Sequence, residues 1–346
     1  MKRAFFLLLA GALGYLGTAG AQVKAGEENH EFPPGVFVNS SGQKYRLADL
    51  KGKVVVLYFY DGTGAESSIF APNVKDAIRK LKDQPVKFIA VAANSPPAAA
   101  ANFARANNLS MPIFADTLGL MQKRFDAKVA GEKTVRFVVI GPDGLVRGND
   151  WFIQSSGPKN YLIKNGLVEK TVEDQKVDWK YNPKDYDAKL QSALQAFEWN
   201  RFEEGMKLLD PFRKSKTKSK AKEAAGLLYT ELKKEGEAWK EEADKAAEEK
   251  PITAYDLYTR VEHVFKGDEL AKDAAAARKK LLETNKAAIS KELAARKDMT
   301  KLEAQLATMS VVQRAQAVVL CKALAKRHPG TPTAEQAQAL AAELAP

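Results

Sequence analysis

Apolar and polar positions follow two different patterns along this chain of 346 residues. In the first pattern, short and almost uninterrupted apolar runs alternate with stretches of helical spacing, and the runs occupy residues 53–60, 86–93 and 136–140. Apolar strands separated by helices are typical of a sheet that is covered on both faces. The pattern predicts an α/β domain with a central sheet flanked by helices.

The second pattern begins at Asp185, where the composition shifts to Ala, Lys, Glu and Leu. Apolar residues recur there at steps of three and four, as in Leu190, Leu194 and Phe197. This spacing places one apolar stripe along each helix. The pattern predicts an all-α domain in the second half of the chain.

Part of the helical region repeats itself at an offset of 63 residues. The matching positions are Ala254, Leu257, Val261, Gly267, Ala271 and Ala274 against Ala317, Leu320, Leu324, Gly330, Ala334 and Ala337. Each copy has the pattern of a helical hairpin, and a looser third copy runs from Leu190 through Leu209 to Leu228. Such hairpins stack because one alone cannot bury its stripe. The segment after Ala325 resembles the turn of tetratricopeptide-type (TPR-like) repeats, which implies a surface for a protein partner.

The first 21 residues have the order of a secretory signal peptide. Lys2 and Arg3 precede an apolar run that ends near Leu16, and small residues follow up to Ala21. The alternative, a membrane anchor, needs about 20 apolar residues, which is longer than this run. We therefore expect an exported protein, periplasmic or secreted, without a membrane span once the signal is cleaved. The expected organisation is a signal peptide over 1–21, an α/β domain over 22–150, a linker over 151–184 and a helical domain over 185–346.

The formal net charge is +11, and its excess is spread over both domains. One basic run contains no acid and no aromatic residue, and its lysines are Lys214, Lys216, Lys218, Lys220 and Lys222. A nucleic-acid site would add stacking aromatic residues or a known module, so no nucleic acid is expected. Two interpretations stay open, a solvated loop and weak contact with an anionic surface such as an envelope polymer or lipid head groups.

Several phrases in the first domain follow one another in a familiar order. They are Asn39–Gly42, Tyr45–Lys53, Val54–Tyr60, Pro72, Met111–Asp116 and Phe137–Gly144. Together they resemble the thioredoxin-like superfamily, in its AhpC/TSA peroxiredoxin and extracytoplasmic thiol-reductant branch. The resemblance covers about residues 30–150 and implies a thioredoxin-like fold. It also implies thiol chemistry, which needs a low-pKa cysteine at a helix N-terminus.

The residues that would perform this chemistry are missing. Counted without gaps between Phe59 and Pro72, the two positions of a C-x-x-C pair fall on Gly64 and Ser67, and neither is cysteine. In the peroxiredoxin register, the peroxidatic position falls near Ser68. No histidine lies nearby in sequence to activate a hydroxyl, so both serines are expected to cap a helix. No catalytic residue is expected here.

The substrate-binding proline is missing as well. Counted back from Gly144, the family's cis-proline position falls on Val135. Arg136, next to it, is expected to be a salt-bridged or exposed strand residue. The resemblance therefore implies a domain with a degenerate active site.

The chain contains one cysteine, Cys321, which lies among aliphatic residues in a predicted helix. We expect it to be buried as a small apolar residue. An exposed thiol that pairs two copies of the protein is the alternative. The three histidines, His30, His263 and His328, are scattered without metal-ligand spacing, so no metal and no cofactor are expected.

These features predict an exported thioredoxin-like protein without redox cysteines. Its function would be non-catalytic binding, or scaffolding, through the helical domain. The alternative is an oxidoreductase of the thioredoxin or peroxiredoxin type, acting in antioxidant defence or thiol-disulfide exchange. That alternative requires thiols supplied by a partner, or Cys321.

Overall fold

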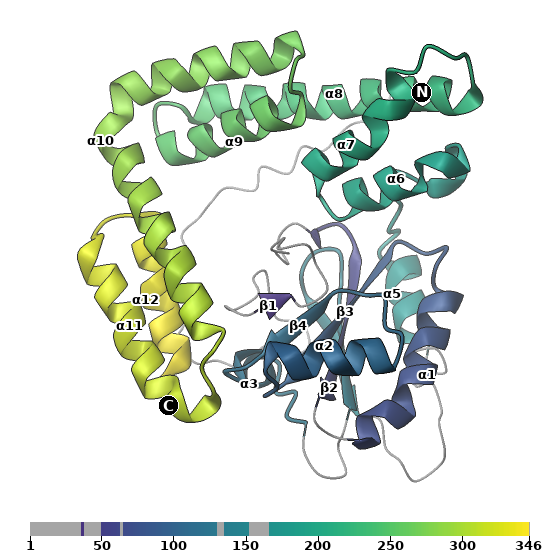
Figure 1. Ribbon diagram of the computed structural model, residues 1–346, viewed down its shortest axis with the longest axis vertical. Coiled ribbons are helices and arrows are strands. Elements are labelled where there is room, and N and C mark those ends of the chain that lie inside the picture. The colour runs from purple at the N-terminus through teal and green to yellow at the C-terminus, as the bar shows by residue number, and fades with distance from the viewer. Residues whose placement is uncertain (1–35, 38–49, 63–64, 130–134, 152–165, 346) are drawn as a thin grey trace.

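The computed structural model describes residues 36–37, 50–62, 65–129, 135–151 and 166–345. The predicted signal peptide and Gly64 lie outside these ranges. Within them, the structure consists of an α/β part and an all-helical part (Figure 1). The predicted fold class is therefore confirmed.

Among the described residues, six strands form one sheet in the order β1-β4-β3-β2-β5-β6. They are β1 (Val36–Phe37), β2 (Val54–Asp61), β3 (Val86–Ala93), β4 (Ile113–Asp116), β5 (Val135–Ile140) and β6 (Val146–Trp151). β2 pairs in parallel with β3 and antiparallel with β5. Both central strands are buried almost from end to end, which is the physical reason for their continuous apolar sequence.

Successive residues of β2 point to opposite faces of the sheet, and each face has its own apolar core. The helices of this part are α1 (Ala65–Lys80), α2 (Pro97–Ala106), α3 (Leu120–Arg124) and α5 (Leu167–Asp174). α5 lies in the segment that the sequence predicts to be a linker. Its Val168 and Val172, with Val177 just beyond, are buried in one of the two sheet cores. Part of the expected linker is thus packed into the α/β domain.

The remaining helices form an arc that leaves the α/β part and returns to it (Figure 1). They are α6 (Gln191–Glu198), α7 (Phe202–Arg213), α8 (Lys220–Ala246), α9 (Pro251–Val264), α10 (Glu269–Leu306), α11 (Arg314–Arg327) and α12 (Pro332–Leu344). None of the helices in the described part of the chain is both long and apolar enough to span a bilayer.

The predicted hairpins correspond to α9–α10 and α11–α12. Each turns at a glycine in the left-handed region, Gly267 with φ +90° and Gly330 with φ +72°. Other residue types rarely adopt this conformation, so glycine is required at both turns. Each second helix is then capped by the residue after the glycine, because Asp268 accepts from Leu270 N and Thr331 accepts from Ala334 N.

The repeat is larger than the hairpin. α10 is interrupted by a non-helical residue, Asn285, with φ −119° and ψ 25°. Beyond this kink the offset of 63 residues still holds between buried positions, which are Leu232 with Ala295, Gly236 with Met299 and Ala243 with Leu306. The first unit is therefore α8, α9 and the first half of α10. The second unit is the other half of α10 with α11 and α12.

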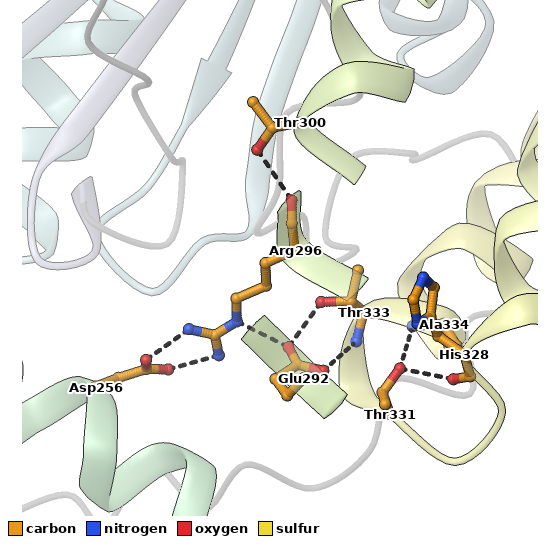
Figure 2. Close-up of polar contacts among 8 residues, drawn as sticks. All are labelled: Asp256, Glu292, Arg296, Thr300, His328, Thr331, Thr333 and Ala334. Carbon is orange, nitrogen blue, oxygen red and sulfur yellow. Dashed lines mark hydrogen bonds and ion pairs between the residues drawn. The ribbon is translucent and has the colours of Figure 1, made fainter. Parts of the chain in front are cut away.

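A polar network joins the two units (Figure 2). Glu292, on the second half of α10, accepts from the hydroxyl of Thr333 at 2.7 Å and from Arg296 Nε at 2.8 Å. Arg296 also forms two bonds to the carboxylate of Asp256 on α9, at 2.6 and 2.8 Å. Bidentate pairs define orientation as well as distance, so this network connects the two units in a specific geometry.

Candidate functional site

The family's reactive thiolate would lie where β2 ends and α1 begins. Here the backbone N–H of Asp61 donates to Ser67 Oγ at 3.0 Å, and that of Gly62 donates to Ser95 Oγ at 3.2 Å. Ser95 Oγ in turn donates to the carbonyl of Ala93 at 2.8 Å. Both serine side chains are fully buried. The turn is thus tied to α1 and β3 by hydroxyl groups.

The prediction that Ser67 and Ser68 cap a helix is wrong, because their hydroxyls bond to groups outside α1. Ser67 is the third residue of α1, and its hydroxyl accepts from Asp61, which precedes the helix. Ser68 Oγ accepts from the side chain of Asn107 at 3.3 Å. Since Ser67 is fully buried, its hydroxyl has no access to a substrate in solution. The hydroxyl of Ser67 therefore links the end of β2 to α1.

The residue at the family's cis-proline position, Val135, belongs to a β-strand. Val135 begins β5, is fully buried, and lies opposite Tyr60 in the antiparallel ladder. The peptide bonds within the described ranges include no cis bond. Of the two expectations for Arg136, exposure is wrong, because the residue is buried and donates to the main-chain carbonyl of Asp126.

Two tyrosines beneath this site were not singled out from the sequence. Tyr58 and Tyr60 are fully buried on one face of β2, and their rings stack with centroids 5.4 Å apart. Tyr60 also stacks on Phe103 at 4.2 Å. Within the described part of the protein, neither hydroxyl has a hydrogen-bond partner. Burial raises the pKa of both phenols, so they stay protonated.

Replacing Tyr60 by phenylalanine is therefore expected to raise the free energy of unfolding by about 1 kcal/mol, because it removes an unsatisfied buried hydroxyl. Urea denaturation measures the change. Tyr258→Phe is the matched control, since the hydroxyl of Tyr258 donates to Asp244 at 2.6 Å and its loss should lower stability by about 1 kcal/mol. A loss of stability in Tyr60→Phe would contradict the assignment.

Cys321 lies on α11 and is fully buried, as expected. Burial raises the pKa of its thiol to about 11, whereas the reactive form of cysteine is the thiolate. α11 and α1 lie on opposite sides of the molecule (Figure 1). The oxidoreductase alternative that uses Cys321 would need this thiol at the surface around Ser67, and the structure does not place it there (Figure 1).

The histidines do not form a common site among the described residues. His263, on α9, lies 3.4 Å from Glu203, and His328, which directly follows α11, lies 3.0 Å from Asp298. His30 is outside the described ranges. Among the described residues there is no group of three His, Cys, Asp or Glu side chains that could hold a metal ion.

The lysine run forms the turn between α7 and α8 and the first residues of α8. Lys214 pairs with Asp210, and the side chains of Lys216, Lys218 and Lys220 are exposed. Lys222 is half-buried. The placement agrees with the interpretation of the run as a solvated turn.

A buried ionic cluster lies between the sheet and α6. Glu198 pairs with Lys53, which precedes β2, and its carboxylate lies 3.7 Å from the Nζ atom of Lys87 on β3. The exposed fractions are 1%, 5% and 7% for Glu198, Lys53 and Lys87. Glu198 also accepts from the backbone N–H of Tyr181 at 2.8 Å. One carboxylate thus faces two lysines away from water.

Aromatic rings complete this cluster. The Nζ atom of Lys87 lies 5.1 Å from the ring centroid of Trp179 and 5.5 Å from that of Trp199. Ring faces attract cations, which offsets part of the cost of burying Lys87. Burial still lowers the pKa of Lys53 and lowers that of Lys87 to about 8. The cluster links the two parts of the protein, and its three charged side chains are buried.

A sequence signal for Glu198 existed. It comes four residues after Leu194, on the predicted apolar stripe of its helix. Lys87 likewise interrupts an otherwise apolar strand. A charged residue on a buried face indicates a buried partner of opposite charge.

Comparison with known proteins finds a family match for the first part of the chain. The model of the AhpC/TSA family matches residues 28–149. A search of curated proteins found no match. The chain is also similar to solved structures of bacterial proteins.

A secreted disulfide oxidoreductase of Mycobacterium tuberculosis is 20% identical, with a TM-score of 0.32, and the match covers 40% of this chain and 95% of that one. A thioredoxin-family thiol:disulfide interchange protein of Chlorobium tepidum is 18% identical, with a TM-score of 0.34, covering 44% and 99%. AhpC of Enterococcus faecalis is 12% identical, with a TM-score of 0.36, covering 45% and 98%. Residues 28–149 therefore match the AhpC/TSA family and form a thioredoxin-like domain, which is followed by a helical C-terminal part.

Proposed function

We propose that the protein is a binding protein whose AhpC/TSA-family domain performs no thiol chemistry. One observation carries this proposal. The only cysteine of the chain, Cys321, is fully buried in the helical part, and the positions of the family's cysteine pair hold Gly64 and Ser67. Without an accessible thiolate, neither peroxide reduction nor disulfide exchange has a nucleophile.

The helical arc is the part suited to binding. Stacked helical units present extended surfaces that contact partners through many side chains, and a protein is the partner proposed here. The exposed lysines at the turn between α7 and α8 support a weaker contact with an anionic surface, which would decrease with salt. The signal-like first 21 residues support export to the periplasm or beyond.

A second candidate is a thioredoxin- or peroxiredoxin-type oxidoreductase. The match of residues 28–149 to the AhpC/TSA family favours it. Such an enzyme would have to use thiols of a partner protein, because the α/β domain contains none.

Both candidates are tested by assays on the chain from Gln22 to Pro346 and on its Cys321→Ala variant. We expect no peroxide consumption with a dithiol donor and no insulin reduction above the buffer rate in either protein. A cysteine-containing AhpC/TSA protein serves as the positive control. Turnover that disappears in Cys321→Ala would establish Cys321 as the nucleophile. Turnover in both proteins would indicate catalysis that does not use Cys321. Either result contradicts the proposal that the protein performs no thiol chemistry.

A further inference from the structure

The far end of the helical arc meets the α/β domain at the segment around α3 (Figure 1). Leu118 and Leu120 of that segment are fully buried in one apolar cluster with residues of the second repeat unit. The members contributed by the helices include Leu302, Leu306, Cys321, Leu340 and Leu344. Two side chains of the α/β domain therefore belong to the core of the helical unit.

Polar contacts surround this shared core. Arg124 on α3 makes two bonds to the carboxylate of Glu343 on α12, at 2.8 and 2.7 Å. Lys123 Nζ donates to the main-chain carbonyls of Glu343 and Ala345, at 3.1 and 2.7 Å. Carbonyls at the end of a helix lack partners within it, so Lys123 acts as a C-terminal cap of α12. From the other side, Arg314 Nε on α11 donates to the carbonyl of Leu118 at 2.7 Å.

The α3 segment is held firmly on its own side. Asp116, at the end of β4, is buried and accepts from the backbone N–H groups of Met121 and Gln122, at 3.2 and 3.1 Å. The side chain of Gln122 donates to Asn94 at 2.8 Å. A segment tied in this way to the ends of two strands offers a preformed surface to the helices.

The second unit is thus held on two sides. On one side the Glu292 and Arg296 network joins it to the first unit (Figure 2). On the other side it contacts the α3 segment. Repeat units stacked in a row need a capping element where the row ends, because the terminal unit otherwise exposes apolar surface.

We infer that the α3 segment of the AhpC/TSA-family domain is an internal docking surface that caps the helical repeats, with α11 and α12 as its partner. The contact made by Leu118, Leu120, Lys123 and Arg124 with the last hairpin is called the clasp below. The clasp closes the arc onto the domain at its second end, the first being the covalent connection beside the Glu198 cluster. The α/β domain then has a structural role that does not depend on redox chemistry.

Cys321 is a built-in probe of the clasp, because it lies in the shared core and is the only thiol. The rate of its reaction with the disulfide reagent DTNB at pH 8 reports how often the core opens. In the full chain from Gln22, Leu120→Ala is expected to raise that rate by about 10-fold or more. Arg124→Glu, which places a second acid against Glu343, is expected to raise it roughly 5-fold.

Two further variants separate the clasp from a general loss of stability. Combining Arg124→Glu with Glu343→Arg restores an ion pair and should return the rate to within about 2-fold of the parent. Arg278→Glu breaks a similar, partly exposed pair with Glu262 in the first unit, at 2.8 Å, and should leave the rate unchanged. The inference is overturned if Leu120→Ala and Arg124→Glu label at the parent rate, if Arg278→Glu accelerates labelling as much, or if the reversed pair fails to restore protection.

Discussion

Replacing Glu198 by alanine is expected to lower the free energy of unfolding by about 3–5 kcal/mol. The reason is electrostatic. The buried side chains of Lys53 and Lys87 both face the carboxylate of Glu198. Removing Glu198 takes this negative charge away from two cationic side chains that are only 5% and 7% exposed. Breaking one partner of a buried pair costs far more than the pair itself contributes, because the remaining charge stays out of water.

Urea denaturation measures this loss. Glu241→Ala is the control, because Glu241 pairs with Lys245 on the exposed surface of α8, and it should change stability by no more than about 0.5 kcal/mol. If Glu198→Ala changes the free energy of unfolding no more than Glu241→Ala does, the buried cluster does not contribute to stability as predicted.

The dependence of stability on pH gives an independent readout of the same cluster. The pKa of Lys87 is lowered to about 8 in the folded protein, whereas an unfolded lysine titrates near ~10.4. Between these values the unfolded chain binds more protons than the folded one, so the free energy of unfolding should rise as the pH increases from about 8 to 10. Urea denaturation across this pH range measures the rise, and Lys87→Met should reduce it, with Lys53 supplying what remains.

Replacing Phe265 by alanine is expected to lower the free energy of unfolding by about 3–5 kcal/mol. Phe265 follows α9, is almost fully buried, and lies where α8, α9 and α10 meet. Its ring contacts the helix backbone at Gly236 so closely that any side chain there would collide with it. The ring also lies 6.3 Å from those of Tyr229 and Trp239, so its removal leaves a cavity that these neighbours cannot fill.

Thermal or urea unfolding tests this prediction, with Leu227→Ala as the control. Leu227 lies on the same helix as Gly236 but is 68% exposed, so its truncation should change stability by no more than about 0.5 kcal/mol. Equal effects of the two substitutions would place Phe265 outside the core of the first unit.

The closed arc has a consequence for the proposed binding role. A surface formed by helices that are anchored at both ends keeps its shape without a partner. Such a surface loses little conformational entropy on binding, which favours affinity. The α/β domain would then contribute to binding through rigidity, with no contact to the partner required.

Several properties were determined by the sequence alone because they depend on local patterns. Continuous apolar runs such as residues 54–60 encode burial on both faces of a sheet, and β2 is buried in this way. The glycines at 267 and 330 encode left-handed turns, and both have positive φ. The absence of cysteine from the family's reactive position needs no coordinates at all, because chemistry that requires a thiolate is excluded by composition.

Other properties were decided only by the tertiary structure, because they join residues far apart in the chain. Glu198 meets Lys53 across 145 positions, and Glu343 meets Arg124 across 219. A helical stripe shows which face is buried but does not name what covers it. The same limit explains why the sequence does not predict that α5 packs on the sheet or that α10 joins two repeat units at Asn285. The position of Cys321 combines both levels, since its neighbours in sequence predicted burial and only the fold placed it in the core that the two domains share.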